Sequence, residues 1–193
     1  MKLYHIDRSC TLKEGDTIDY ITNLSVGKSY LNDYCKEVID KEYSEGISLH
    51  GKRYFLDDYS SSSYVMDIIF EYERRLNYPD KLSRYQSFFA FDLEGLFDFI
   101  KLKSLDFEFI KVYEFDYDYC EKYNLNLIRG WGQFDTIVHS KYYWENKDDF
   151  NEERKPLYEY LVKLPVKIKK EVSLEELRKQ LKNEEPEANN QDK

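Results

Sequence analysis

The spacing of apolar residues predicts two strong amphipathic helices in the middle of the chain. Residues 64–77 carry apolar side chains at helical intervals behind a serine run, 60–63, that can cap the helix: Val65, Ile68, Ile69, Tyr72 and Leu76. On this pattern Glu71 and Arg75 belong to a solvent-facing polar side, and Pro79 ends the helix. A second helix over 92–102 begins at Asp92 as its N-cap.

Two weaker helices are expected nearer the ends of the chain. The pattern over 32–43 predicts a short helix that closes before Gly46. Ser173 and Glu176 have the spacing of a capping box, and leucines at 174, 177 and 181 give the following helix an apolar stripe. The residues after 183 are polar and include a proline. We therefore expect one domain over residues 1–182 and a disordered tail over 183–193.

Alternating or continuous apolar runs predict strands at 2–6, 83–91, 107–115 and 157–168. Gly130-Trp131-Gly132, between two apolar runs in 124–140, indicates a strand, a turn and a further strand. Strands interspersed with helices in this order predict an α+β fold.

Charge and cysteine usage limit the class of protein. Among 193 residues, 38 are acidic and 29 basic, and the net charge of −9 disfavours a long groove for a nucleic-acid backbone. Cys10, Cys35 and Cys120 are odd in number and form no CxxC pair, which is typical of reduced thiols. The first residues include a charge and a histidine in place of an apolar leader, and no apolar run has membrane-spanning length. A cytoplasmic protein outside the membrane is expected.

Several common catalytic signatures are absent from the sequence. It has no GxGxxG, P-loop, HExxH or GxSxG motif, which argues against Rossmann dehydrogenases, P-loop enzymes, zincins and α/β-hydrolases. The three histidines, His5, His50 and His139, do not have the spacing of a metal site, so no metal is expected.

Three polar features remain as candidate chemistry. His5 lies on the first predicted strand with Arg8 just beyond it, although a strand histidine with a backbone partner gives the same pattern. Polar residues 83–87 open an otherwise apolar strand, which a solvent-exposed strand entrance would also explain. Glu159 lies between Leu157 and Leu161 on one strand face, where an ionised group is costly unless a partner or a function holds it. An edge strand whose glutamate reaches water is the alternative.

Taken together, these segments resemble the ADP-ribosyltransferase superfamily. Its members have a histidine or arginine on the first strand, a Ser- or Tyr-containing motif on a middle strand and a glutamate on a late strand. YEYLVKLPVKI, 158–168, is similar to the ending of bacterial members that modify nucleic acids and of the related RNA 2′-phosphotransferases. ERRLNYPDKLSRYQSFFAF, 73–91, is similar to a bacterial family of the same superfamily.

The resemblance implies two small, mostly antiparallel sheets that form a split-sheet cleft, with helices 64–77 and 92–102 packed outside. This cleft would bind NAD as a substrate. The resemblance gives Glu159 the catalytic role, since a carboxylate on the ribose 2′-hydroxyl stabilises the oxocarbenium-like charge that develops when nicotinamide leaves. His5 would hold the ribose, Arg8 or Arg84 would bind the pyrophosphate, and Tyr85 would stack on nicotinamide. Ser83 and Ser87 would support these groups through hydrogen bonds.

The implied activity is transfer of ADP-ribose to a macromolecule, either nucleic acid or protein. Leu157 stands where protein-arginine modifiers usually have a second acid, which argues against arginine as the acceptor. The resemblance also suggests a bacterial toxin or anti-phage effector, with a cognate antitoxin as a possible partner. Two alternatives stay open: a non-catalytic binding or immunity protein on the same fold, and an RNA phosphotransferase.

Overall fold

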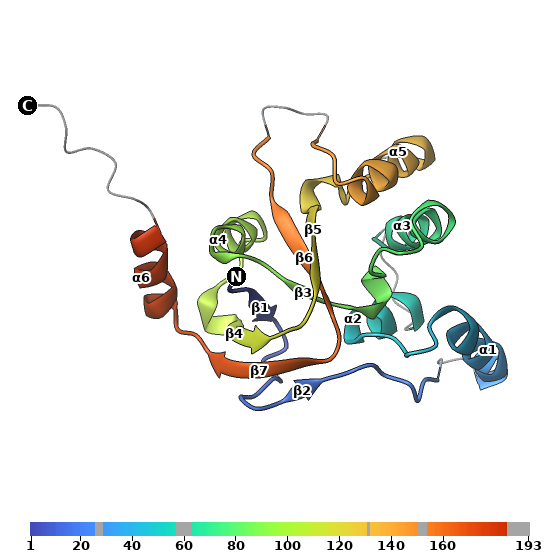
Figure 1. The fold of residues 1–193 in the computed structure, drawn as a ribbon, viewed down its shortest axis with the longest axis horizontal. Coiled ribbons are helices and arrows are strands. Elements are labelled where there is room, and N and C mark those ends of the chain that lie inside the picture. The colour runs from blue at the N-terminus through green and yellow to red at the C-terminus, as the bar shows by residue number, and fades with distance from the viewer. Residues whose placement is uncertain (26–28, 57–62, 131, 150–153, 185–193) are drawn as a thin grey trace, which may run out of the picture.

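Two antiparallel sheets form the centre of the computed structural model, which describes residues 1–25, 29–56, 63–130, 132–149 and 154–184 (Figure 1). Within these ranges the strands are β1 (Tyr4–Asp7), β2 (Thr17–Ile18), β3 (Ser87–Ala90), β4 (Lys111–Asp116), β5 (Cys120–Asn124), β6 (Tyr158–Lys163) and β7 (Val166–Glu171). One sheet has the order β1-β4-β7-β2 and the other the order β3-β6-β5. The predicted α+β class with two small antiparallel sheets is confirmed.

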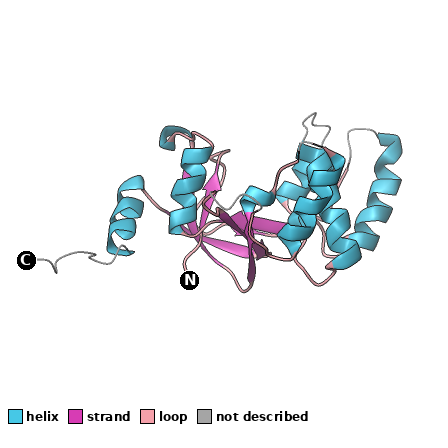
Figure 2. Cartoon of the chain, turned by 90° about the horizontal axis from the view of Figure 1, so that it is seen from above, coloured by secondary structure: helices cyan, strands magenta, loops and turns pink. Residues whose placement is uncertain are grey.

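The helices lie in two groups on either side of the strands (Figures 1 and 2). They are α1 (Asn32–Glu42), α2 (Leu49–Gly51), α3 (Ser63–Asn77), α4 (Leu93–Leu102), α5 (Gln133–Trp144) and α6 (Leu174–Glu184), together with the short helical turns η1 (Ser29–Leu31), η2 (Lys52–Leu56), η3 (Arg84–Gln86), η4 (Phe107–Phe109) and η5 (Leu125–Leu127). Helices α4 and α6 form one group, and α1, α2, α3 and α5 form the other.

Local capping explains where two of the predicted helices begin. The Asp92 carboxylate accepts a hydrogen bond from the Gly95 N–H at 2.8 Å, as an N-cap should. Ser173 and Glu176 make both bonds of the predicted capping box, at 3.0 and 3.2 Å, at the start of α6. Helix α6 continues to Glu184, two residues into the segment expected to be a tail, and 185–193 lie outside the described residues.

Buried apolar residues fill the space between and around the sheets. One cluster joins the two sheets and includes Phe88 of β3, Phe115 of β4, Val162 of β6 and Ile168 of β7. A second packs α4 and α6 against β1 and β4, and a third packs α3 and α5 against β5 and β6. The two faces of the β3-β6-β5 sheet therefore have different neighbours, the other sheet on one side and helices on the other.

The predicted strand, turn and strand over 124–140 is wrong, because most of this segment is helical. After the turn η5, α5 begins at Gln133, with Gly132 at its N-cap and Thr136 hydroxyl bonded to the Gly132 carbonyl at 2.7 Å. The Asp135 carboxylate accepts from the Gly132 N–H at 2.8 Å, so a glycine that suggested a hairpin turn instead begins a helix. Trp131 lies outside the described residues.

Three predicted strands are shorter or divided. Of the run 107–115, Phe107–Phe109 form the turn η4, and the strand β4 begins only at Lys111. The run 157–168 forms β6 and β7, which belong to different sheets and are separated by Leu164 and Pro165. The run 83–91 begins with the turn η3, so only Ser87–Ala90 pairs with β6. A proline has no N–H to donate to a ladder, which suits the break between β6 and β7.

The buried face of α3 is the one that the sequence assigned to solvent. Ile68, Tyr72 and Leu76 are 41%, 59% and 77% exposed, whereas Glu71 is 4% exposed. Asp67 and Arg74 are buried on the same face, with Phe70 beside them. These charged groups enter the interior because each has an ionic or hydrogen-bonded partner there, which offsets their desolvation. Of the serines expected to cap the helix, 60–62 lie outside the described residues.

Candidate functional site

A buried ion pair between Arg84 and Glu159 is the centre of the candidate site. Arg84 lies in η3 at the entrance to β3, and Glu159 lies on β6, the strand that pairs with β3. The Nη1 group of Arg84 donates to the Oε1 atom of Glu159. The two residues are 5% and 3% exposed, so two of the predicted site residues meet inside the protein. The edge-strand alternative for Glu159 is wrong, because β6 is the middle strand of its sheet.

Two further side chains complete the polar centre. Tyr143 of α5 donates its hydroxyl to Glu159 Oε1 at 2.8 Å and accepts from Arg84 Nη1 at 2.9 Å. Asp67 of α3 accepts from Arg84 Nε at 3.2 Å. Arg84 is therefore shared between two carboxylates, and its guanidinium also lies 4.9 Å above the centre of the Phe89 ring.

Burial and charge set the protonation states around the pair. Burial alone would lower the pKa of Arg84, but the Glu159 carboxylate holds that pKa well above its ordinary value. Burial raises the pKa of Asp67 in spite of the neighbouring Arg84, and burial followed by Glu159 raises the pKa of Tyr143 well above the usual range. Arg84 is thus a permanent cation and Tyr143 a permanent hydrogen-bond donor.

Glu159 keeps one carboxylate oxygen available. Both of its hydrogen bonds end on Oε1, and no residue in the described part of the chain donates to Oε2. Arg84 likewise uses Nε and Nη1, and no described residue accepts from its Nη2. A ligand that presents a hydroxyl to Oε2 of Glu159 and an acceptor to Nη2 of Arg84 would satisfy the remaining hydrogen-bonding capacity of both side chains.

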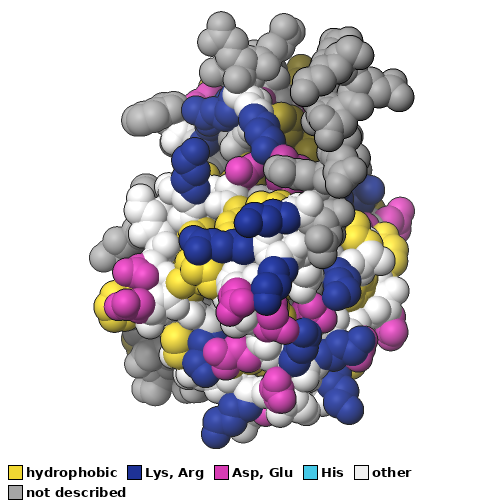
Figure 3. Space-filling model, turned by 90° about the vertical axis from the view of Figure 1, so that its left-hand side faces the viewer, with side chains coloured by type: hydrophobic (Ala, Val, Ile, Leu, Met, Phe, Trp, Pro, Cys, Tyr) yellow, Lys and Arg dark blue, Asp and Glu magenta, His cyan; other side chains and the backbone are white. Residues whose placement is uncertain are grey.

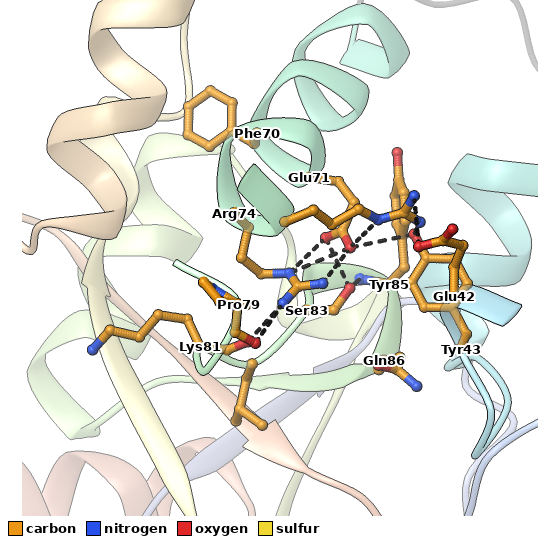
Figure 4. Close-up of polar contacts among 12 residues, drawn as sticks. Glu42, Tyr43, Phe70, Glu71, Arg74, Pro79, Lys81, Ser83, Tyr85 and Gln86 are labelled. Carbon is orange, nitrogen blue, oxygen red and sulfur yellow. Dashed lines mark hydrogen bonds and ion pairs between the residues drawn. The ribbon is translucent and has the colours of Figure 1, made fainter. Parts of the chain in front are cut away.

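A second carboxylate, Glu71 of α3, fixes the segment that carries Arg84. Figure 4 shows Glu71 among side chains from three parts of the chain, and it accepts from Arg74 at 2.8 Å, Tyr43 at 3.3 Å and Ser83 at 2.9 Å. Arg75 also donates to it, at 3.3 Å. The Ser83 hydroxyl, which the resemblance assigned to NAD binding, is used here to tie η3 to α3.

The remaining residues of the 83–87 segment are also packed into the protein. The Ser87 hydroxyl donates to the Ser83 carbonyl at 2.7 Å. The Tyr85 ring stacks on Phe55 at 5.2 Å and meets Tyr43 edge-on at 6.2 Å, so its faces belong to the core rather than to a nicotinamide. Its hydroxyl is buried and has no hydrogen-bond partner among the described residues.

The structure does not bring His5 to Glu159. His5 Nδ1 donates to the Phe89 carbonyl at 2.8 Å, and its ring stacks on Phe88 at 4.1 Å. Phe88 and Phe89 point to opposite faces of β3, and the Phe89 face is the one that Glu159 shares. The backbone-satisfied strand histidine, one of the two interpretations of the sequence, is therefore the geometry observed. Arg8 is exposed in the turn after β1.

The sequence did not predict a site role for four residues that lie near the ion pair. Glu71 was predicted to lie with Arg75 on a solvent-facing side of α3, and Asp67, one turn before Glu71, was not singled out. Tyr143 lies in a helix that was not expected. His50 of α2 stacks on Tyr54 and tilts against Phe89, with both ring centres 4.4 Å away. No motif or short-range spacing joins these residues to Glu159.

The comparisons with known proteins give a family. The model of DUF2441, described as a protein of unknown function, matches residues 3–176, which is most of the chain. The chain belongs to the DUF2441 family. No curated protein matches it. The matched range contains both sheets and the Arg84–Glu159 pair, so the candidate site of this DUF2441 protein lies within the family domain.

Other kinds of site find little support among the residues described for the DUF2441 chain. No group of three or more His, Cys, Asp or Glu side chains there is arranged to hold a metal ion. None of its described helices is long and apolar enough to cross a membrane. On the face that carries α6, Figure 3 shows Lys and Arg side chains interspersed with Asp and Glu rather than a basic surface, and pairs such as Lys170–Glu176 explain the mixing.

Proposed function

We propose that this DUF2441 protein is an NAD-dependent ADP-ribosyltransferase in which Glu159 is the catalytic carboxylate. One observation carries the proposal. Glu159 is 3% exposed and is fixed through Oε1 by Arg84 and Tyr143, while no described residue bonds to Oε2. A preorganised anion with one oxygen available is what stabilisation of a developing ribose cation requires.

The chemistry follows from the position of that charge. The bond between ribose C1′ and the nicotinamide nitrogen breaks, and its electron pair leaves with nicotinamide, which becomes neutral. The oxocarbenium-like ribose is stabilised by Glu159, whose Oε2 accepts from the 2′-hydroxyl. A nucleophilic oxygen or nitrogen of the acceptor then bonds to C1′ and loses its proton to solvent or to a nearby base.

The arrangement of strands also supports the proposal. Tyr4 of β1 forms a bridge with Phe91, the residue after β3, and β3 pairs with β6, so the three motif segments lie next to one another. Two split antiparallel sheets are the fold that the resemblance implies. The acceptor we propose is a macromolecule, protein or nucleic acid, and the setting is a cytoplasmic bacterial toxin or anti-phage effector that a cognate antitoxin restrains.

A second candidate is a non-catalytic binding or immunity protein on this fold. It is favoured by the ionic network itself, because Arg84 holds both Glu159 and Asp67 and buried pairs of this kind also occur for structural reasons. On this view Glu159 serves only to neutralise Arg84.

Glu159→Gln separates these functions, with Asp67→Asn as the matched control. Each substitution removes one of the two carboxylates on Arg84 and keeps the side-chain shape. If Glu159 is catalytic, NAD consumption falls by about 10²–10³ in Glu159→Gln alone. The two variants should melt at temperatures similar to each other and below that of the wild type, because each leaves Arg84 with one carboxylate in place of two. The assay follows nicotinamide release, with labelled NAD and a cell lysate whose protein and nucleic acid are then separated.

Full turnover by Glu159→Gln would show that the carboxylate is not catalytic. Equal losses in both variants would point to a structural role for the network. A wild-type protein that neither binds nor consumes NAD would favour the binding-protein function.

A further inference from the structure

His50 lies in a short helix that is anchored next to Arg84. Ser48, the N-cap of α2, donates to the Tyr85 carbonyl through its backbone N–H at 2.8 Å and through its hydroxyl at 3.0 Å. Helix α2 is therefore tied to η3, one residue after Arg84. The position of His50 follows that of Arg84 because both are fixed to the same segment.

The His50 ring shares an aromatic neighbour with the ion pair. Its centre is 4.4 Å from that of Phe89, and the Arg84 guanidinium is 4.9 Å from the same ring. Tyr54 stacks on His50 as well, at 4.4 Å. His50 thus belongs to the helix-facing side of β3, the side of the sheet on which Glu159 lies.

The Nε2 atom of His50 is a buried polar atom without a partner. No donor or acceptor in the described part of the chain bonds to it. Leaving a buried polar group unpaired costs roughly 1–3 kcal/mol, so such an atom in a native protein calls for an explanation. The Tyr85 hydroxyl, on the segment to which α2 is tied, is a second unpaired atom of the same kind.

His50 is neutral at pH 7, which limits the kinds of ligand group that it can bind. Burial lowers the pKa of His50 well below its ordinary value, and the nearby cations Arg84 and Arg53 lower it further. A neutral imidazole both donates and accepts hydrogen bonds but does not supply a charge. Its natural partners are neutral polar groups such as a ribose hydroxyl or a carboxamide.

We infer that His50, rather than His5, is the histidine of the NAD site, and that its Nε2 bonds to the nicotinamide-ribose end of the dinucleotide. The inference rests on the proposed function, because it places that ribose at Glu159 and therefore next to Arg84 and Phe89. It assigns to α2 a binding role that no motif in the sequence indicated.

The test uses ring-conserving substitutions and two ligands. His50→Phe keeps the ring contacts with Tyr54 and Phe89 but removes Nε2. As the control, His5→Phe keeps the stack on Phe88 but removes the ring nitrogens of His5. Isothermal titration with NAD should show binding roughly 3- to 10-fold weaker for His50→Phe, the loss of about one hydrogen bond, and unchanged for His5→Phe. Binding of ADP, which lacks the nicotinamide-ribose end, should be unchanged in both.

The melting temperatures provide an independent readout. His50→Phe removes an unpaired polar atom, so its melting temperature should stay level or rise, whereas His5→Phe loses a hydrogen bond to Phe89 and should melt lower. If the wild type binds NAD and His50→Phe binds it equally well, the inference is wrong and the proposed function stands. If ADP binding weakens as much as NAD binding, His50 is not at the nicotinamide end. A wild type that binds no NAD overturns the proposed function and this inference with it.

Discussion

Glu71 shows how a single carboxylate can organise a buried region. It accepts hydrogen bonds from Arg74, Arg75, Tyr43 and Ser83, and it is 4% exposed. Breaking a buried ion pair by removing one partner is costly because the other charge stays desolvated. The network therefore stabilises the fold chiefly by keeping the two arginines neutralised, and through Ser83 it fixes the segment before Arg84.

Glu71→Ala should accordingly lower the free energy of unfolding by about 3–5 kcal/mol. The control is Glu73→Ala on the same helix, where the side chain is partly exposed and accepts a hydrogen bond from Asn77, and the expected change is within about 0.5 kcal/mol. Urea unfolding of both variants measures the difference. Equal stability of the two would mean that the buried network contributes little.

For Glu159 the sequence predicted that the side chain is buried but not which residue it pairs with. Leucines two residues on either side placed Glu159 on a buried strand face, and it is buried. Its partner Arg84 lies 75 residues away, a separation that no local pattern covers. The role given to His5 has the same limitation, because strand position alone does not say which side of a sheet faces the ligand. The assignment of Glu159 as catalytic stays a prediction.

Among the elements, α2 is short and packs closely against η3. Gly51 ends it, and an ideal Cβ at this position would lie 2.2 Å from the Tyr85 carbonyl oxygen, well inside contact distance. No other residue fits there without moving α2 away from η3. The position of His50 therefore depends on a glycine that is not at a turn.

Gly51→Ala should destabilise the protein by about 1–3 kcal/mol, the usual effect of overpacking, and should displace α2. Gly132→Ala is the control, because a Cβ there would meet only the Asp135 carboxylate at 3.5 Å. Thermal unfolding compares the two, and the near-ultraviolet circular dichroism of the rings around His50 reports the displacement. A Gly51→Ala protein as stable as the control would show that α2 adapts freely.

Element type could be predicted wherever a periodic pattern coincided with a cap. Helices α4 and α6 were found in this way, whereas α1, α3 and strand β1 were predicted from the pattern of their residues without a cap that the structure describes. The buried face of α3 could not be predicted, because periodicity identifies an apolar stripe but not charged residues that are buried with their ionic partners. Helix α5 was missed because glycine at 132 is equally suited to a turn and to a helix N-cap.

For the molecule as a whole, the three histidines share one electrostatic property. Burial lowers the pKa of His5, His50 and His139, so all three are less protonated in the folded protein than in the unfolded chain at the same mildly acidic pH. At these three positions the unfolded state then binds more protons, so the contribution of the histidines to stability falls as the pH falls below about 6.5.

The free energy of unfolding should therefore be lower at pH 5.5 than at pH 7.5, with each histidine contributing at most about 1.4 kcal/mol per pH unit. His5→Asn, which keeps a donor near the Nδ1 position, should show a shallower dependence than the wild type, and the difference isolates the histidine part. Urea titrations at the two pH values measure it. A stability that is flat or rises on acidification, with no effect of the substitution, would contradict this account.

Strands β6 and β7 are each an inner strand of their own sheet, and only Leu164 and Pro165 separate them. Neither sheet can lose its inner strand without pulling on the other. We therefore expect the two sheets to unfold as one cooperative unit. The same connection affects the candidate site, because a displacement of β7 is transmitted to β6, the strand of Glu159, through Leu164 and Pro165. Binding of a partner at β7 or β2 is therefore expected to shift the position of the Glu159 carboxylate.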